Sequence, residues 1–214
     1  NQVKFKKYKV DIRDGEVLEK IFKEESPNII IHAAALARDR DSMDIPLEFI
    51  QTNIIGSQNV INAAMNISSI EQCVVISTRS AVGQAASAET LMTEDALMRP
   101  INPYGATKLA MEGLFHSYHS DEKVPIKICR MQPIYGPRCR HDMFVWRILN
   151  SILTGEKIQK YGTGEGVRDW LYISDAVDAV FALIDTEVSY DVFNIGVGQM
   201  TSTNDLIKIC EETT

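Results

Sequence analysis

Two apolar runs, Ile29-Ile-Ile-His-Ala33 and Gln72-Cys-Val-Val-Ile-Ser-Thr78, have the length of buried β-strands. Residues 46–66, which lie between them, carry a helical pattern. Two strands that are separated by a helix are expected to be parallel, because the helix has to cross over the sheet before the second strand begins. This strand–helix–strand unit therefore predicts a parallel sheet with helices packed on it.

The same alternation continues along the rest of the chain. Further strands are expected near 126–131, 170–173 and 192–195, and further helices near 103–119, 142–153, 174–186 and 203–212. The pattern predicts a doubly wound α/β fold with a parallel sheet. Beyond Arg130 the chain is less regular and richer in Gly and Pro. We therefore expect residues 1–130 to form the main sheet domain, and residues 131–214 to contribute a small lobe together with late sheet elements.

Composition and charge limit the class of protein. The chain has 214 residues, of which 45% are hydrophobic and 24% charged, as in a globular domain with its own core. A formal net charge of −7 argues against nucleic acid or an anionic membrane as a general partner. No apolar run reaches the roughly 18 residues of a membrane span, and the first residues lack the apolar core of a signal peptide. We expect a cytoplasmic protein.

Metal and disulfide sites are not expected. The four cysteines show no Cys-x-x-Cys spacing, so neither a disulfide nor a zinc site is predicted. His116 and His119 lie three residues apart, but the chemistry inferred below needs no metal.

The run Asn102-Pro-Tyr-Gly-Ala-Thr-Lys108 indicates proton-transfer chemistry. Asn102 is a competent N-cap and Pro103 a good first helical residue, so a helix should begin here. Four-residue spacing then places Tyr104 and Lys108 on one face of that helix. A cation within roughly 4–6 Å lowers a tyrosine pKa from its ordinary value of about 10, which would make the phenol a usable base near neutral pH. A bare Tyr-x-x-x-Lys occurs often by chance, so its surroundings decide its meaning.

Six stretches in the same order resemble the motifs of the extended short-chain dehydrogenase/reductase family, which comprises NAD-dependent nucleotide-sugar epimerases and dehydratases. They are Asp11-Ile-Arg-Asp14, Ile29-Ile-Ile-His-Ala-Ala-Ala35, Asn53-Ile-Ile-Gly-Ser57, Val74-Val-Ile-Ser-Thr78, Arg130-Met-Gln-Pro-Ile-Tyr-Gly-Pro137 and Gly162-Thr-Gly-Glu-Gly-Val-Arg-Asp-Trp-Leu-Tyr-Ile-Ser-Asp175. The resemblance implies that residues 1–130 form a partial dinucleotide-binding domain and that the cofactor is NAD, although NADP is left open.

The resemblance also implies roles for individual residues. Tyr104 would be the general base on a sugar hydroxyl, Lys108 would hold the nicotinamide ribose, and Thr78 would complete the catalytic set, with Ser77 and Ser80 as alternatives to Thr78. The implied NAD contacts are Asp11, Ile12, Ala33, Ala34, Ala35, Asn53, Ser77, Tyr104 and Lys108.

The flanking residues suggest the reaction and the substrate. Dehydratases of the family carry Asp-Glu after the catalytic Thr, whereas Thr78 is followed here by Arg79-Ser80, which favours 4-epimerisation through transient oxidation at C4. The run Arg138-Cys-Arg-His-Asp-Met143 resembles that of UDP-glucuronate 4-epimerases, so a UDP-sugar, with UDP-glucuronate as the candidate, is expected as substrate. The expected substrate contacts are Arg40, Ser80, Arg138 and Arg168.

The resemblance begins at Asp11, near the family's third strand, and ends before its usual C-terminal segment. The glycine-rich turn that holds the cofactor pyrophosphate does not occur in this sequence. We therefore expect a chain that is truncated at both ends, or a product that has lost that turn. The alternatives are a dehydratase or reductase of the same family, or a catalytically silent module that binds NAD or a nucleotide sugar. A homodimer is expected.

Overall fold

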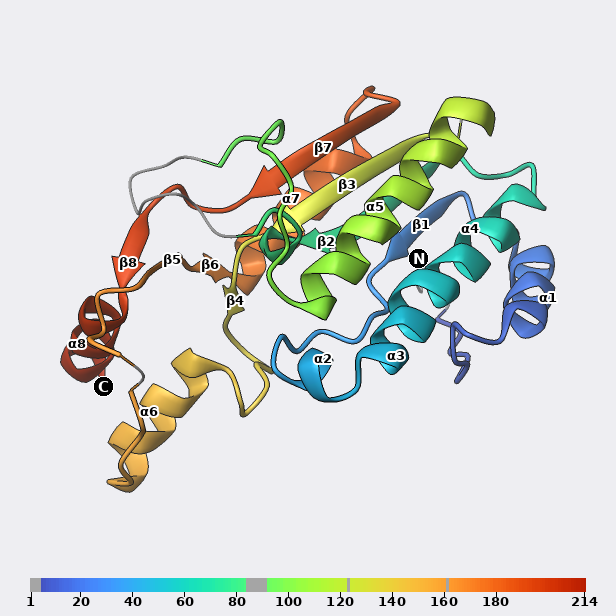
Figure 1. Cartoon of the computed structure of the whole chain (residues 1–214). Helices are drawn as coiled ribbons and strands as arrows, with labels where there is room; N and C mark the ends of the chain where they lie inside the picture. The colour runs from blue at the N-terminus through green and yellow to red at the C-terminus, as the bar shows by residue number, and fades with distance from the viewer. Residues whose placement is uncertain (1–4, 84–91, 123, 161) are drawn as a thin grey trace.

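The computed structural model describes residues 5–83, 92–122, 124–160 and 162–214. Its centre is a four-stranded sheet of β1 (Ile29–His32), β2 (Gln72–Thr78), β3 (Ile126–Met131) and β7 (Tyr190–Ile195), in the order β1-β2-β3-β7 (Figure 1). All three pairings are parallel. The parallel sheet predicted from the sequence is confirmed.

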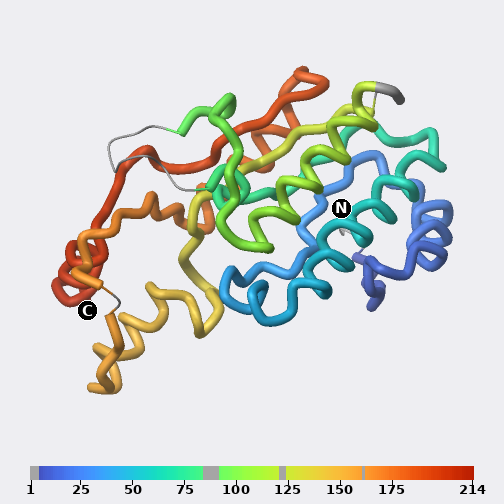
Figure 2. The backbone as a smooth tube through the Cα atoms, viewed as in Figure 1, coloured from blue at the N-terminus to red at the C-terminus, as the bar shows by residue number. Residues whose placement is uncertain are grey.

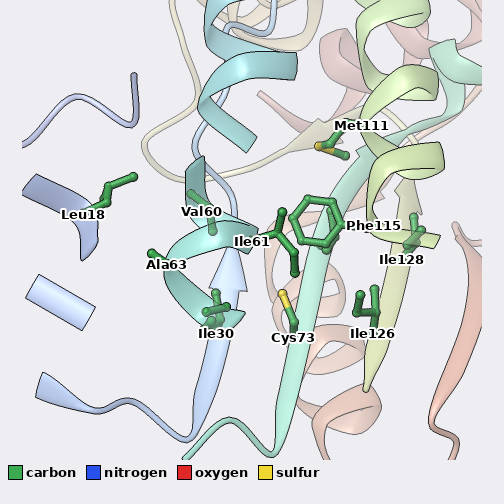
Figure 3. Close-up of a cluster of buried hydrophobic side chains, with 12 residues drawn as sticks. Leu18, Ile30, Val60, Ile61, Ala63, Cys73, Met111, Phe115, Ile126 and Ile128 are labelled. Atoms are coloured by element: carbon green, nitrogen blue, oxygen red, sulfur yellow. The ribbon is translucent and has the colours of Figure 1, made fainter. Parts of the chain in front are cut away.

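Helices cover both faces of this sheet. On one face lie α1 (Gly15–Glu25), α4 (Ser57–Met65) and α5 (Pro103–Glu122), and on the other lies α7 (Ile173–Ile184). Successive residues of β2 point to opposite faces, so Cys73 and Val75 pack under α4 and α5 (Figure 3) while Val74 packs under α7. A strand that is buried on both faces favours apolar residues, which is why β2 carries the unbroken apolar run Cys73-Val-Val-Ile76. β3 is buried along its whole length as well, but it includes Lys127 and Arg130, whose charged groups have partners inside the protein.

The N-terminal helix α1 is not among the helices expected from the sequence. Its first turn is capped by Asp14, whose carboxylate accepts a hydrogen bond from the Val17 amide at 3.2 Å. It ends at Ser26, which adopts a left-handed conformation with φ of 44°. Leu18 is its buried contact with the core.

The helix expected over 46–66 consists of three pieces. It begins as α3 (Pro46–Phe49), continues as a π-helical segment over Ile50–Gly56, and ends as α4. A short helix, α2 (Asp41–Asp44), precedes it. The wide π turn carries Asn53, whose side chain points out of the helix toward the loop that follows β1.

Residues beyond β3 build smaller elements beside the sheet before the chain returns to it as β7 (Figure 2). β4 (Ile134–Tyr135) pairs with β6 (Leu171–Tyr172), and β5 (Val167–Asp169) pairs with β8 (Met200–Ser202). The helices α6 (Phe144–Thr154) and α8 (Thr203–Thr213) pack against each other around Ile148 and Leu206.

The strand expected near 170–173 is present as the short β6, but it pairs with β4 and lies outside the four-stranded sheet. The buried carboxylate of Asp169 accepts hydrogen bonds from the backbone amides of Val197 (3.1 Å) and Gly198 (2.9 Å). These contacts tie the segment to the loop after β7.

Within the described residues, no helix is both long enough and apolar enough to cross a membrane.

Candidate functional site

A cleft of about 1730 Å³ opens at the carboxyl ends of the central strands. Ligands of open parallel α/β sheets bind at this edge, because the loops that follow the strands converge there. Its walls come from residues 37–41 after β1, residues 76–80 at the end of β2, the start of α5, and residues 131–147 after β3. The expected substrate residues Arg40, Ser80, Arg138 and Arg168 all line it.

Tyr104 enters the cleft from the first turn of α5. Asn102 caps this helix by accepting the Gly105 amide at 2.8 Å, as predicted, and Pro103 is its first residue. A Cβ atom on Gly105 would overlap the carbonyl oxygen of Ser80, so only glycine allows the helix start to approach the turn after β2 this closely. The Tyr104 phenol forms a side-chain hydrogen bond with Thr78, the last residue of β2.

The protonation of Tyr104 differs from the prediction. Burial raises its pKa above the ordinary value of 10, and the hydrogen bond from Thr78 opposes that rise only in part. Lys108 does not supply the expected lowering of the Tyr104 pKa, because its ammonium donates instead to the Ile76 carbonyl at 2.5 Å. Burial also lowers the pKa of Lys108 to about 8, against the opposing effect of the Glu112 carboxylate.

Among the three candidate hydroxyls, Thr78 lies closest to the expected role. The Ser77 hydroxyl is buried and donates to the Glu112 carboxylate. The Thr78 hydroxyl accepts the Ser80 amide at 3.2 Å and also contacts Tyr104, so it lies between the strand end and the phenol. Ser80 lies on the cleft wall, where it was expected as a substrate contact.

Asn53 is fully buried, and its amide is used inside the protein. The side-chain oxygen accepts the Leu36 amide at 2.8 Å, and the nitrogen donates to the Leu36 carbonyl and to the Thr107 hydroxyl, both at 3.0 Å. These bonds fasten the loop after β1 to α5. The expected direct contact of the Asn53 side chain with NAD is not favoured by this geometry, because its hydrogen-bonding groups already have partners.

The other expected cofactor residues differ in how far they are exposed. Ala33 and Ala34 are exposed directly after β1, and Ala35 is half-buried beside them. Asp11 is exposed and pairs with Arg13 (2.6 Å), which lowers the pKa of its carboxyl to about 2. Ile12, in contrast, packs into the core: a Cβ on Gly56 would come within 2.6 Å of it.

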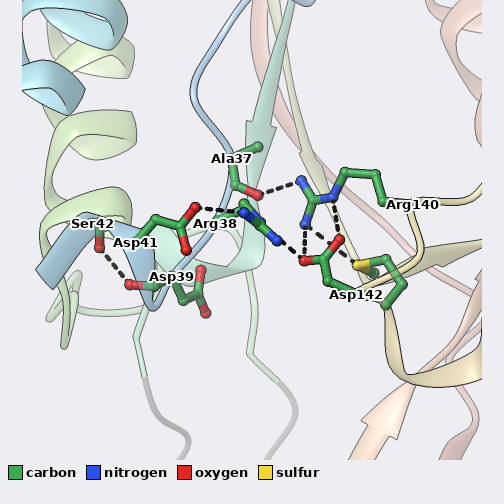
Figure 4. Close-up of polar contacts among 8 residues, drawn as sticks. Ala37, Arg38, Asp39, Asp41, Ser42, Arg140 and Asp142 are labelled. Carbon is green, nitrogen blue, oxygen red and sulfur yellow. Dashed lines mark hydrogen bonds and ion pairs between the residues drawn. The ribbon is translucent and has the colours of Figure 1, made fainter. Parts of the chain in front are cut away.

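A network of ion pairs joins two walls of the cleft (Figure 4). Arg38 pairs with Asp41 (2.8 Å) and with Asp142 (3.1 Å), and Asp142 also pairs with Arg140 (3.0 Å). Arg140 in addition donates to the Ala37 carbonyl at 2.7 Å. The segment after β1 is thereby held against the segment after β4. Arg38 and Asp142, which join the two segments, are 104 residues apart in the sequence.

The expected arginines differ in how they are held. Arg138 is exposed, and its backbone has a left-handed φ of 65°, which a non-glycine residue rarely adopts. Arg168 is exposed in β5, next to the buried Asp169, because neighbouring residues of a strand face opposite sides. Arg40 lies on the cleft wall near Asp39 and is exposed.

Sequence reasoning missed Arg79 and Asp39 as a charged pair in the cleft. Burial raises the pKa of Asp39 even though Arg168, Arg79 and Arg140 lie close enough to oppose the rise. Burial and the positive charge of Arg168 together lower the pKa of Arg79. The position of Arg79 directly after Thr78 was a usable signal, whereas Asp39 lies in a charged run without periodicity. Among the described residues, no group of three or more His, Cys, Asp or Glu side chains is placed to hold a metal ion.

Residues 1–196 match the model of the NAD dependent epimerase/dehydratase family. The chain is 32% identical over 209 residues to a UDP-glucuronate 4-epimerase of Thermodesulfobacterium geofontis, covering 97% of this chain and 63% of that protein. It is 31% identical to a dTDP-D-glucose 4,6-dehydratase of Dictyostelium discoideum, covering 97% of this chain and 50% of the relative. The chain thus spans between half and two thirds of these relatives.

Solved structures show the same likeness. The UDP-glucose 4-epimerase of Thermotoga maritima, solved with UDP-glucose, superposes with a TM-score of 0.89 at 29% identity, over 96% of this chain and 67% of that one. The UDP-glucuronic acid 4-epimerase of Bacillus cereus, solved with UDP-glucuronic acid and NAD, superposes with a TM-score of 0.86 at 32% identity, over 95% of this chain and 63% of that one.

Proposed function

Because this chain belongs to the NAD dependent epimerase/dehydratase family, we propose that the native protein containing it is a nucleotide-sugar 4-epimerase. The observation that carries the proposal is the pairing of Thr78 with Tyr104 at the carboxyl end of β2, with Lys108 one helical turn behind the phenol. This arrangement suits proton exchange with a hydroxyl on a sugar carbon.

The residues present fit the nicotinamide half of NAD. The donor set at the end of β2 combines the Thr78 and Tyr104 hydroxyls with the Lys108 ammonium, groups that suit a ribose and the reacting hydroxyl of a sugar. Asp11, an exposed carboxylate on the β1 side of the sheet, suits the hydroxyls of the adenosine ribose. A glycine-rich turn for the pyrophosphate does not lie among the described residues. Bound NAD would supply reversible hydride transfer.

The chain's own residues would bind the sugar and move its proton. In its phenolate form Tyr104 would take the proton of the C4 hydroxyl and later return it, while Thr78 would hold the same hydroxyl by a hydrogen bond. Because burial raises the pKa of Tyr104, the neutral phenol is the resting form at pH 7. The proton-transfer step then depends on substrate and cofactor charges to make the phenolate accessible. Between the two transfers the sugar has to turn over within the wide cleft.

The residues after Thr78 favour epimerisation over dehydration. Elimination of water needs an extra acid and base beside the reacting carbon, and that position holds Arg79 and Ser80. A second candidate is nevertheless a 4,6-dehydratase, because Asp39 is an exposed carboxylate on the cleft wall in electrostatic range of Tyr104. A carboxyl group at this position suits proton exchange with a leaving hydroxyl.

For the substrate we propose a UDP-sugar, with UDP-glucuronate as the candidate. Arg138 and Arg168 line the cleft, and a guanidinium matches a carboxylate or a phosphate with two parallel hydrogen bonds. The named relatives that act on or bind UDP-sugars support the nucleotide part of this proposal.

The test is incubation of the native protein with NAD and either UDP-glucuronate or UDP-glucose, with the products identified by NMR. We expect the C4 epimer and no 4-keto-6-deoxy sugar. Tyr104→Phe should abolish turnover while NAD affinity changes little. A 4-keto-6-deoxy product that disappears in Asp39→Asn would establish the dehydratase, and near-normal turnover in Tyr104→Phe would refute both.

A further inference from the structure

Three polar residues of α5 contact the last three residues of β2, one each. Lys108 donates to the Ile76 carbonyl, Glu112 accepts the Ser77 hydroxyl, and Tyr104 hydrogen-bonds with Thr78. Tyr104, Lys108 and Glu112 follow one another at four-residue intervals and so share one face of the helix. Two of these contacts belong to the proposed reaction site, and the Glu112 contact has no role in it.

The Glu112 carboxylate is anchored by an ion pair inside the protein. The Arg130 guanidinium donates to both of its oxygens, with Nη2–Oε2 at 2.8 Å and Nε–Oε1 at 3.2 Å. Both side chains are almost fully buried, with 7% and 6% of their surface exposed. Arg130 is also the residue of β3 that lies opposite Ser77 in the sheet register, so strands β2 and β3 hold the carboxylate together.

Stability alone is a weak explanation for such a pair. Removing two charges from water costs about as much as their attraction returns, and apolar replacements of buried ion pairs are often neutral or stabilising. What the pair does provide is a fixed geometry. The remaining nitrogen of Arg130, Nη1, donates to the Glu94 carbonyl at 2.8 Å, so all three nitrogens of the guanidinium have a hydrogen-bond partner.

We propose that Glu112 is a positioning residue: held by Arg130 and Ser77, it fixes the register of α5 against β2 and thereby sets Tyr104 against Thr78 and Lys108 against Ile76. The catalytic meaning of this register rests on the proposed function, whereas the register itself does not. A sliding or rotation of α5 by a fraction of a turn would separate the phenol from the Thr78 hydroxyl, and misplacement of about 1 Å can cost roughly 100-fold in rate.

Glu112 also acts on the charge of Lys108. The titratable or charged groups that face Lys108 in the described structure are Glu112 on its own helix, His32 on β1, and Arg130 on β3 behind Glu112, while β2 offers only the Ile76 carbonyl. Glu112 is the anion in this set, and it raises the pKa of Lys108 against the larger effect of burial. Removing Glu112 should therefore lower the Lys108 pKa below its value of about 8.

The test uses three variants of the native protein. Glu112→Gln removes the anion and leaves the buried Arg130 without a counter-ion. The double variant Glu112→Leu with Arg130→Met removes both charges and so keeps a folded protein available. Lys127→Met is the control: Lys127 is a buried cation of the same strand β3, but it donates to the Leu183 carbonyl of α7 and to the Thr186 carbonyl just after that helix, on the far side of the sheet.

The first measurement is the pH dependence of kcat and KM. We expect kcat to fall by about 10-fold to 100-fold in both Glu112 variants, with little change in KM. In Glu112→Gln, which removes only the anion, the alkaline limb of the profile should also shift to lower pH. Lys127→Met should lower the melting temperature and leave both kcat and the profile unchanged. A folded double variant with wild-type kcat and pH profile would overturn the proposal, as would an equal loss of kcat in Lys127→Met.

The second measurement does not need turnover. The Lys108 side chain is titrated by NMR in protein with labelled lysine, and its signal is identified by its loss in Lys108→Met. A lowered Lys108 pKa in Glu112→Gln supports the proposal even if the wild-type protein shows no epimerase activity, in which case only the proposed function fails. An unchanged Lys108 titration in the folded Glu112 variants would overturn the positioning role.

Discussion

Replacing Asn53 with alanine tests how the loop after β1 is held. The Asn53 side chain makes three hydrogen bonds, two to the backbone of Leu36 and one to the Thr107 hydroxyl, and it has no exposed surface. Each bond contributes about 1 kcal/mol to folding, and the truncation leaves the half-buried backbone groups of Leu36 without these partners. We therefore expect Asn53→Ala to reduce the free energy of unfolding by about 3 kcal/mol, which lowers the melting temperature by roughly 6–12 °C.

Asn59→Ala is the matched control on the following helix. Its side-chain nitrogen donates to the Ile12 and Arg13 carbonyls, both at 3.0 Å, but the site is only partly buried. Water can replace these bonds, so the expected loss is about 1 kcal/mol. Both variants are compared by urea unfolding, with the slope of the transition checked for equality. A difference of less than about 0.5 kcal/mol between them would refute the view that Asn53 is a structural anchor.

Further predictions concern pH and substrate choice. Burial and the Lys108 cation lower the pKa of His32 from 6.5 to about 4. As the pH falls from 6.5 to 4, His32 becomes protonated in the unfolded chain before it does so in the folded protein. The free energy of unfolding should therefore decline by about 3 kcal/mol over this range. His32→Phe should flatten that part of the curve of unfolding free energy against pH; an unchanged slope contradicts the assignment. Arg138→Leu should reduce kcat/KM for UDP-glucuronate more than for UDP-glucose, whereas Arg168→Leu should reduce both alike, since both sugars carry the same diphosphate. Equal losses in Arg138→Leu would remove the carboxylate contact. Thr78→Ala should slow turnover by roughly 10-fold, as for one lost hydrogen bond, and a larger loss in Ser80→Ala would transfer the role to Ser80.

The elements with strong local signals could be predicted from the sequence. The start of α5 follows from Asn102 and Pro103, and the structure has the helix where these two residues place it. β2 was predictable because burial on both faces favours its unbroken apolar run Cys73-Val-Val-Ile76. The four-residue spacing of Tyr104 and Lys108 likewise predicted that they share one face of this helix.

The features that depend on distant partners could not be predicted. Lys108 was expected to lower the pKa of Tyr104, but the Ile76 carbonyl, 32 residues away in the chain, takes its ammonium. The strand near 170–173 pairs with β4 outside the four-stranded sheet, and the preceding residue Asp169 is held by the loop after β7. The electrostatic surroundings of Asp39 likewise depend on the fold, because the cleft walls bring three distant arginines close to its carboxylate. No periodicity in the sequence records such contacts.

The π-helical segment Ile50–Gly56 makes the length of this region matter more than its composition. A π turn holds one more residue than the α turn it replaces, and deletion of a single residue there would let the helix close in the ordinary way. Because that extra residue is taken up within the wide turn, its loss would leave α3 and α4 on nearly the same faces, and Phe49 would keep its edge-on contact with the Tyr104 ring at 6.2 Å. What would be lost is the wide turn that directs the Asn53 side chain to the Leu36 backbone. Conservative substitutions in this segment should be tolerated far better than the loss of one residue.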